Sequence, residues 1–281
     1  MVENRPWLTL FTHLILILGI LIVAFPIYIA FVASTHELEA LLQAPMPLLP
    51  GSSFFKNYAQ ALTEGATAVG APVWLMMTNS LIMALGITFG KISISMLAAF
   101  AIVYFRFPFR MGFFWMIFIT LMLPVEVRIL PTYKVVADLG LLNTYPGLII
   151  PLIASATATF LFRQVFLAVP DELLEAARID GAGPMRFFKD ILIPISRTNI
   201  AALFVIMFIY GWVQYLWPLL VTTDESLYTL LIGINRMLAV GDDQAQWQIV
   251  MATTMLAMLP PVAVVIFMQK LFVKGLTETE K

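Results

Sequence analysis

The sequence predicts an all-α integral membrane protein with six spanning helices. Hydrophobic residues fill 61% of the 281 positions and charged residues only 12%, which is too apolar for a soluble protein of this size. The runs without Asp, Glu, Lys or Arg show no polar–apolar alternation and are far longer than barrel strands, which disfavours transmembrane strands. These runs are 6–36, 65–90 and onward from Lys91 to 105, 111–125, 139–162, 198–223 and 244–269.

A helix needs about twenty apolar residues to cross the bilayer core, and five of the six runs exceed that length. The third run, 111–125, is the shortest, so the chain must reach water or a lined cavity near Pro124. The first run lacks a convincing cleavage site and is interpreted as a retained helix. We expect one transmembrane domain over 1–281, with an outer loop at 33–75, a cytoplasmic loop at 168–198, and helices at about 8–32, 76–104, 111–130, 145–167, 199–221 and 248–272.

The distribution of Lys and Arg predicts the orientation, because basic loops are retained in the cytoplasm. With the amino terminus inside, the outer segments carry four basic residues: Lys56, Arg128, Lys134 and Arg236. The inner segments carry eleven: Arg5, Arg106, Arg110, Arg163, Arg178, Arg186, Lys189, Arg197, Lys270, Lys274 and Lys281. Both termini and the loop at 168–198 are therefore expected in the cytoplasm of a multi-pass protein.

That polar loop, which we call the Glu175 loop (168–198), is too polar to lie in hydrocarbon. Pro170-Asp171-Glu172 predicts a helix start, because acidic residues in the first turn favour the positive end of the helix dipole. The helix should run to Ile179, turn at Gly181 and Gly183-Pro184, and be followed by a second helix over 185–193. Small Ala176 and Ala177 would let the first helix enter a partner's groove. By composition alone, an ordinary amphipathic loop helix remains the alternative.

The loop's residues resemble the EAA loop of ABC importer permeases, through which an ATPase subunit acts on the membrane domain. The matching positions are Glu175, Ala176, Ala177, Asp180, Gly181, Phe187, Ile191 and Pro194. The chain also resembles the maltose permease group over nearly its whole length, and within that group the permease subunits of sn-glycerol-3-phosphate importers. Further stretches carry this resemblance: 55–58, Asn79-Ser80, 90–93, 105–108, 123–128, Pro131, 155–160, Tyr210 and Trp217-Pro218.

The resemblance implies the type I ABC importer permease fold in a bacterial inner membrane. It also implies a second, non-identical permease subunit, two ATPase subunits that bind ATP and Mg, a periplasmic substrate-binding protein, and membrane lipid, with no nucleic acid. The chain has no Gly-x-x-x-x-Gly-Lys-Ser/Thr loop, so we expect no catalytic residue, cofactor or metal in it, and transport rather than enzyme activity. Glu175 would meet a basic residue of the ATPase, and Gly181 would permit the turn. The tail Lys270–Lys281 would lie against the ATPase.

The chain departs from the family pattern at three positions. Ile193 stands where the family often has Leu, and Thr198 where it often has Pro. Val213 stands where an asparagine commonly follows Trp212, so a role of that asparagine in the pathway cannot be transferred to this chain.

Lys91 is the first candidate for the substrate pathway, because an unpaired ammonium deep in a membrane costs on the order of 3 kcal/mol or more. It could face the cavity and attract a phosphate, or it could snorkel or pair with an acidic group of the second permease. Trp212, Gln214 and Tyr215 could stack against a polyol or form an aromatic belt. For Trp217, next to Pro218, the belt is the preferred interpretation.

A second polar group lies near the outer end of the third predicted helix. Glu126 and Arg128 stand between Pro124 and Pro131, and prolines free backbone carbonyls that need partners. A hinge with an ion pair between subunits is favoured over a substrate contact.

Other functions remain open as alternatives. The same machine could carry glycerophosphodiesters, or a neutral sugar or polyol. A gradient-driven secondary transporter normally has intramembrane acids and internal repeats, and neither is evident. An intramembrane enzyme would need a nucleophile–base pair or a metal set, whereas this chain has no Cys and two isolated residues, His13 and His36.

Overall fold

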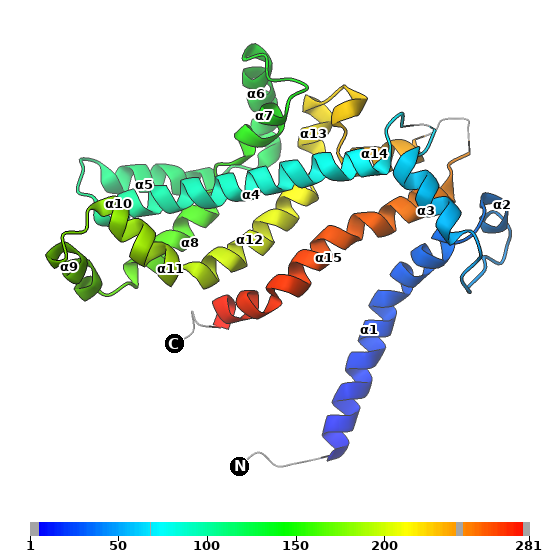
Figure 1. Ribbon diagram of the computed structural model, residues 1–281, viewed down its shortest axis with the longest axis horizontal. Coiled ribbons are helices and arrows are strands. Elements are labelled where there is room, and N and C mark those ends of the chain that lie inside the picture. Colours follow the sequence, from blue (N-terminus) through cyan, green and yellow to red (C-terminus); the bar gives the residue numbers. More distant parts are fainter. Residues whose placement is uncertain (1–5, 68, 240–243, 278–281) are drawn as a thin grey trace. The chain divides into compact units, whose positions relative to one another are not determined.

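A computed structural model describes residues 6–67, 69–239 and 244–277, and within these ranges it contains helices and loops but no strand (Figure 1). The chain divides into two compact units, where the sequence predicted a single domain. One unit holds the described residues up to Leu75 together with Gly233–Leu259. The other holds Met76–Ile232 together with the described residues from Pro260 onward. The helices α4 (Val73–Tyr104), α14 (Leu230–Leu238) and α15 (Trp247–Thr277) each contribute to both units.

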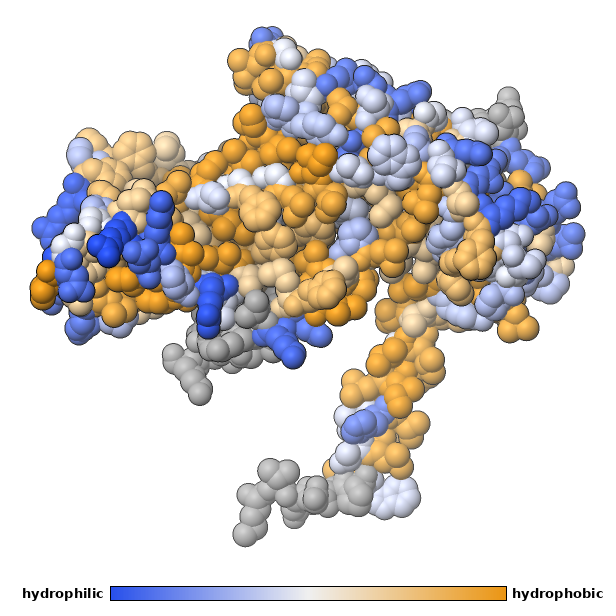
Figure 2. Space-filling view, viewed as in Figure 1, coloured by the Kyte–Doolittle hydropathy of each residue, from blue (hydrophilic) through white to orange (hydrophobic). Residues whose placement is uncertain are grey.

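The first unit begins with α1 (Pro6–Ser34), close to the predicted helix at 8–32. Apolar residues cover most of the visible face of α1 (Figure 2), as expected for a helix that faces lipid or a partner. The predicted outer loop at 33–75 contains two helices, α2 (Leu38–Leu41) and α3 (Phe54–Thr63). Buried Asn57 on α3 donates to the carbonyl oxygens of Ser34 at 2.9 Å and His36 at 2.8 Å, which fixes α3 against the end of α1.

The second unit is built around α4, which matches the predicted helix at 76–104. One apolar cluster joins α4 to α8 (Ala156–Leu167), to the Glu175 loop and to α12 (Arg197–Trp212). Its buried members are Ile92, Met96, Ala99, Phe100, Ala158, Phe162, Phe166, Ala177, Phe187, Phe188, Leu192, Leu203 and Met207.

A second apolar cluster joins the first half of α4 to α6 (Val125–Asp138), α7 (Tyr145–Ile149) and α13 (Leu216–Val221). Its buried members are Met83, Ile87, Ile129, Val136, Leu148, Trp217 and Val221.

The predicted helix at 111–130 is wrong in its continuity. The chain instead forms α5 (Arg110–Ile119), a 3-10 turn η1 (Thr120–Met122), and then α6, with Pro124 as the residue that caps α6. Leu123 is extended, with φ −88° and ψ 114°, because the residue before a proline is excluded from the helical region. The break therefore comes from Pro124, the position at which the sequence had required the chain to leave the hydrocarbon.

Two other predicted helices are also interrupted. The segment 145–167 consists of α7, a 3-10 turn η2 (Ile150–Leu152) and α8, and the segment 199–221 consists of α12 and α13 with a break between Trp212 and Leu216. Among the described residues, three helices are long and apolar enough to cross a membrane: Trp7–Ser34, Val73–Tyr104 and Trp247–Lys270. Up to five spans result if each of two bent helix pairs counts as one span. These pairs are Tyr145–Leu152 with Ala156–Leu167, bent by 51°, and Pro184–Ile195 with Arg197–Trp212, bent by 74°. The predicted six spans are therefore not established by helix length and composition.

Candidate functional site

The first helix of the Glu175 loop is α9 (Asp171–Ile179), as predicted. Pro170 caps it in an extended conformation, and Asp171 and Glu172 occupy its first turn. Gly181, with φ +70°, lies in the left-handed region that favours glycine. The amide of Ala182 then donates to the carbonyl oxygen of Ala177 at 2.8 Å and closes the end of the helix.

The second predicted helix, 185–193, consists of three short pieces that follow one another. They are α10 (Pro184–Phe187), a π-helical turn η3 (Phe188–Leu192) and α11 (Ile193–Ile195). The wider π turn ends two residues before Pro194, which has no amide hydrogen to continue an α-helical ladder. Pro194 is exposed, whereas Phe187 is 2% exposed and belongs to the apolar cluster.

The candidate coupling residues divide between the surface and the core. Glu175, Ala176, Asp180 and Gly181 are exposed. Ala177 is only 5% exposed and packs into the cluster, so it is not available to a partner's groove. The large apolar residue that α9 exposes most is Ile179, which is 86% exposed. Of the two residues of the predicted small-residue face, Ala176 is therefore exposed and Ala177 is buried.

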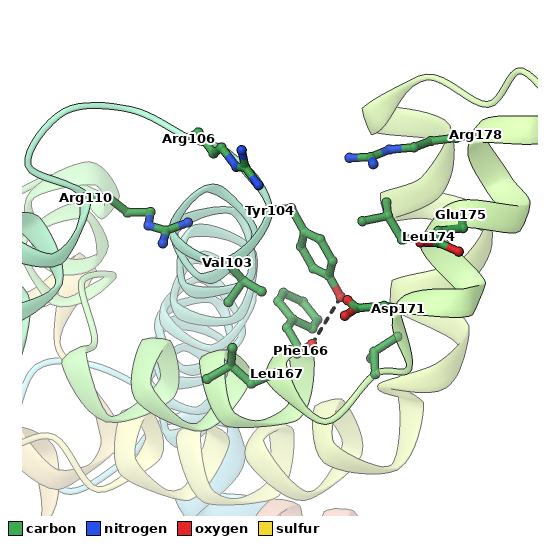
Figure 3. Close-up of a pocket in the computed structure, with 11 residues that line it drawn as sticks. Val103, Tyr104, Arg106, Arg110, Phe166, Leu167, Asp171, Leu174, Glu175 and Arg178 are labelled. Atoms are coloured by element: carbon green, nitrogen blue, oxygen red, sulfur yellow. Dashed lines mark hydrogen bonds between the residues drawn. The ribbon is translucent and has the colours of Figure 1, made fainter.

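A cavity of about 430 Å³ lies between α9 and the end of α4 (Figure 3). Residues spaced three and four apart on one face of α9 line one side of it. Figure 3 shows Arg106 and Arg110 extending into the cavity from the opposite side, and Arg178 extending into it from α9. The complete lining is Val103, Tyr104, Arg106, Arg110, Phe166, Leu167, Val169, Asp171, Leu174, Glu175 and Arg178.

The charged groups of this cavity have both signs. Asp171 lies beside the hydroxyl of Tyr104, which donates to the carbonyl oxygen of Phe166 at 3.1 Å (Figure 3). The guanidinium of Arg110 donates to the carbonyl oxygen of Phe105 at 3.4 Å. Within the described part of the chain, the ion pairs join Lys56 to Glu37 and Arg186 to Asp190, so the cavity's charges face one another without pairing.

Lys91 lies within α4 and is 6% exposed, so its ammonium is buried inside the chain. Its Nζ atom is 3.6 Å from the centroid of the Tyr210 ring on α12. The Nε2 atom of Gln214 donates to the backbone carbonyl oxygen of Tyr210 at 3.1 Å. The structure therefore brings two of the predicted pathway candidates, Lys91 and Gln214, to the same tyrosine.

The remaining candidate residues lie on different elements. Pro124 and Arg128 are exposed at the start of α6, and the side chain of Glu126 lies outside the described residues. Tyr215 is half-buried before α13, and Val213, the position that departs from the family, is 53% exposed. Trp212 is 5% exposed and stacks on Phe208, with ring centroids 5.9 Å apart.

The expectation that Trp217 belongs to an aromatic belt is wrong. Its side chain is 3% exposed, and its Nε1 atom donates to the carbonyl oxygen of Gly147 at 3.2 Å. The residue four positions after Gly147 is Pro151, which has no amide hydrogen to donate to this carbonyl. The indole supplies a donor inside the second apolar cluster.

Sequence reasoning did not assign a role to Asn79, which the structure places in a buried hydrogen-bond network. Its Nδ2 atom donates to the carbonyl oxygens of Ser226 at 2.8 Å and Tyr228 at 3.0 Å, and its Oδ1 atom accepts from the Tyr145 hydroxyl at 2.6 Å. The available signal was the polar pair Asn79-Ser80 inside an apolar helix. For Tyr210 and for the arginines of the cavity, no comparable pattern in the sequence indicated which residues lie close to them.

Residues 91–278 match the family model described as the binding-protein-dependent transport system inner membrane component. The chain is 62% identical to the sn-glycerol-3-phosphate transport system permease protein UgpE of Agrobacterium fabrum over 100% of both chains. It is 58% identical to the protein of that name in Escherichia coli K12, again over 100% of both.

Among solved structures, the crystal structure of a bacterial ABC transporter involved in the import of the acidic polysaccharide alginate has a similar fold. The match has a TM-score of 0.82 and covers 96% of this chain and 98% of that one, at 20% sequence identity. This likeness supports the predicted all-α permease fold. From the family match and the full-length relatives, the chain belongs to the family of inner membrane components of binding-protein-dependent transport systems.

Proposed function

We propose that this chain is a permease subunit of an ATP-driven importer that carries sn-glycerol-3-phosphate, and glycerophosphodiesters, into the cytoplasm. The observation that carries this proposal is the 62% identity, over the full length of both chains, to a permease protein named for sn-glycerol-3-phosphate transport. The same machine with a neutral sugar or polyol as its substrate is the alternative that the experiment below separates.

In this proposal the chain pairs with a second, non-identical permease subunit. Two ATPase subunits bind ATP and Mg below the membrane, and a periplasmic protein delivers the substrate above it. The excess of Lys and Arg in alternate loops supports a topology with both termini and the Glu175 loop in the cytoplasm. The loop then faces the compartment that contains ATP.

The packing of the Glu175 loop supports a coupling role. Ala177 and Phe187 lie in the same apolar cluster as Met96 and Phe100 of α4. Because close-packed interiors transmit displacement rather than absorb it, a movement of α9 would displace α4 and α12 with it. Closure of the ATPase dimer would thus favour one of two packings of the membrane helices, and ATP hydrolysis would favour the other.

Within α9, exposed Glu175 is the proposed contact with a basic residue of the ATPase. Ala176 and Ile179 would enter its groove, and Gly181 would hold the turn that follows. Asp180 and Pro194 would fix the two ends of the loop.

Lys91 is proposed to favour an anionic substrate through its positive charge. Its ammonium is covered by Tyr210, so it would act on a phosphate across the ring or after the ring moves, rather than through the contact present here. Gln214 and Tyr215, near the break between α12 and α13, would supply the polar groups of the pathway. Pro124 and Arg128, with Glu126, would form a gating hinge at the start of α6.

The test is substrate-stimulated ATP hydrolysis by the complete importer in proteoliposomes, with sn-glycerol-3-phosphate compared against maltose. We expect stimulation by sn-glycerol-3-phosphate alone, and a loss of about tenfold in Glu175→Ala, because a charge-assisted contact contributes about 1.5–3 kcal/mol. Glu172→Ala removes the same type of residue at another exposed position of α9. It is the matched control and should retain stimulation.

Three results would contradict the proposal. Stimulation by maltose would move the substrate to neutral sugars. An equal loss in Glu172→Ala and Glu175→Ala would remove the specific role of Glu175. Failure to assemble with any ATPase would reopen the gradient-driven alternative.

Lys91 has a separate test in the same vesicles. Lys91→Met should raise the concentration of sn-glycerol-3-phosphate needed for half-maximal uptake, while Lys91→Arg, which keeps the charge, should retain most of the native value. Unchanged uptake in Lys91→Met would remove the role in phosphate attraction.

A further inference from the structure

The cavity beside α9 lies at the end of a membrane span. α4 has 32 residues and is therefore about 48 Å long at 1.5 Å per residue. The hydrocarbon core is about 30 Å thick and the bilayer with its headgroups about 40–45 Å. Tyr104, the last residue of α4, and the arginines that follow it therefore fall at the depth of lipid headgroups.

The segment between α4 and α5 has the composition of an interfacial segment. It alternates aromatic and basic residues, and its rings are exposed: Phe105 is 42%, Phe107 36% and Phe109 83% exposed. Leu167, on the opposite wall of the cavity, is 52% exposed. Aromatic rings with guanidinium groups beside them fit the boundary between acyl chains and phosphates.

The α9 side of the cavity carries charges of both signs. Arg106 and Arg110 extend into the cavity from the interfacial segment and Arg178 from α9, while Asp171 extends from the start of α9 beside Tyr104 (Figure 3). Glu175 of α9 also lines the cavity, and within the described residues none of these groups forms an ion pair with another. A ligand that binds both the arginines and Asp171 carries an anion at one end and a hydrogen-bond-donating cation at the other.

We propose that this cavity binds the headgroup of phosphatidylethanolamine. Arg106 and Arg110 bind the lipid phosphate, the primary ammonium donates to Asp171, and the acyl chains lie along the exposed phenylalanines. The volume of about 430 Å³ is within the range of about 300–1,000 Å³ found for small-ligand sites.

Other phospholipids satisfy only part of this arrangement. Phosphatidylcholine has the same net charge, but its quaternary ammonium has no hydrogen to donate to Asp171. Phosphatidylglycerol has the phosphate but no cation. The site therefore discriminates by the headgroup's N–H donors rather than by charge alone.

Binding of the lipid does not depend on what the importer carries, but its consequence rests on the proposed function. The headgroup would join α9 to the end of α4, two elements that move together in the proposed coupling. Lipid retention and coupled ATP hydrolysis are therefore measured separately, so that the two proposals can fail independently.

The test is native mass spectrometry of the purified full-length chain in its complex, loaded with equimolar phosphatidylethanolamine, phosphatidylcholine and phosphatidylglycerol of identical acyl chains. We expect phosphatidylethanolamine to be retained about tenfold more than either other lipid, as a charge-assisted hydrogen bond implies. Mono- and dimethylated headgroups, which lose N–H donors one at a time, should be retained progressively less.

Two variants test the proposed contacts with the lipid phosphate and with its ammonium. Arg106→Gln and Asp171→Asn should each remove the preference, whereas Arg186→Gln and Glu172→Gln, which change the same charges elsewhere in the loop, should keep it. Equal retention of the three lipids by the unmodified complex overturns the proposal even if a variant does not fold. Displacement of the lipid by soluble phosphoethanolamine at equal concentration also overturns it, because the site would then be for a soluble phosphate ester.

Discussion

The ammonium of Lys91 on α4 is stacked over the ring of Tyr210 on α12, with Nζ 3.6 Å from the ring centroid. Both side chains lie in apolar helices, and Lys91 is 6% exposed. A cation over the face of an aromatic ring is stabilised by the ring's negative face, by about 2 kcal/mol or more where water is excluded. This contact gives a buried charge a partner without a carboxylate.

The ring rather than the hydroxyl of Tyr210 should carry this contact. Tyr210→Phe should leave the thermal stability of the detergent-solubilised protein nearly unchanged, and Tyr210→Leu should lower it by about 2 kcal/mol because the ammonium loses the aromatic face. Thermal unfolding followed by intrinsic fluorescence or differential scanning measures both. Equal losses in the two variants would assign the stabilisation to the hydroxyl instead.

The sequence predicted that Lys91 needs a partner or a cavity, but not which partner. A charged side chain in an apolar run needs a partner or a polar cavity in any fold. The position of Lys91 in the sequence is therefore enough to predict that need. The identity of Tyr210 depends on how α4 and α12 pack, which no local pattern encodes. The arginines of the cavity illustrate the same limit: Arg106 and Arg178 were assigned to one side of the membrane, and their convergence on one cavity follows only from tertiary structure.

Asn79 should be among the least replaceable residues of α4. It is fully buried, and it bonds two carbonyl oxygens, those of Ser226 and Tyr228, and the hydroxyl of Tyr145. Asn79→Leu removes all three hydrogen bonds, of which the one to the Tyr228 carbonyl is buried and the other two are partly buried. The loss of the buried bond alone costs about 1–3 kcal/mol. Thermal unfolding should show a loss of several kcal/mol or a failure to accumulate folded protein.

Thr88 offers the matched control for that experiment. It is equally buried in α4, but its hydroxyl donates only to Ala84 of its own helix, at 2.6 Å. Thr88→Val keeps the shape and leaves the helix's own hydrogen bonds in place, so it should cost about 1 kcal/mol or less. A loss at Thr88→Val as large as that at Asn79→Leu would show that the network around Asn79 adds no stability of its own.

Gly211 should not tolerate a side chain, because α12 approaches the backbone of α4 at this position. A Cβ atom on Gly211 would lie 2.8 Å from the Cα of Ala84, a backbone atom that cannot rotate away. Gly211→Ala should therefore cost about 1–3 kcal/mol in thermal unfolding, through displacement of the two helices. Gly112→Ala on α5, where the nearest atom is an ordinary 3.8 Å away, should leave stability unchanged or raise it slightly.

The helices themselves were mostly predictable, and their interruptions were not. Long apolar runs predicted α1, α4 and α15 closely, because length and hydrophobicity suffice to specify a spanning helix. The break before α13, at residues 213–215, contains no proline or glycine that marks it. The breaks at Pro124 and before α8 did have local causes visible in the sequence, because Pro151 lies in the second break and Ser155 caps α8. At both places the prediction of a continuous helix ignored these signals.

The exposed pair of Lys56 and Glu37 provides a test of the electrostatics outside the membrane. The Lys56 Nζ atom lies 2.8 Å from Glu37 Oε1, and this hydrogen bond, together with the charge attraction, lowers the pKa of Glu37 below its ordinary 4.5 and raises the pKa of Lys56 above its ordinary 10.5. A lowered acid pKa means that the contact is complete above pH 4.5 and is lost as pH falls through the lowered value. A raised lysine pKa means that the contact is complete below pH 10.5 and is lost as pH rises through the raised value.

Lys56→Met should therefore return the pKa of Glu37 toward 4.5, measured by the chemical shift of its carboxyl carbon in selectively labelled protein. In the native protein, added salt should move the pKa of Glu37 part of the way toward 4.5. The side chains of Lys56 and Glu37 are 69% and 59% exposed, so salt screens their attraction. Thermal stability at neutral pH should hardly change, since an exposed ion pair contributes little. An unchanged titration midpoint in Lys56→Met would mean that Glu37 and Lys56 do not hold this contact in solution, and that the position of α3 relies on other contacts, among them the buried amide of Asn57.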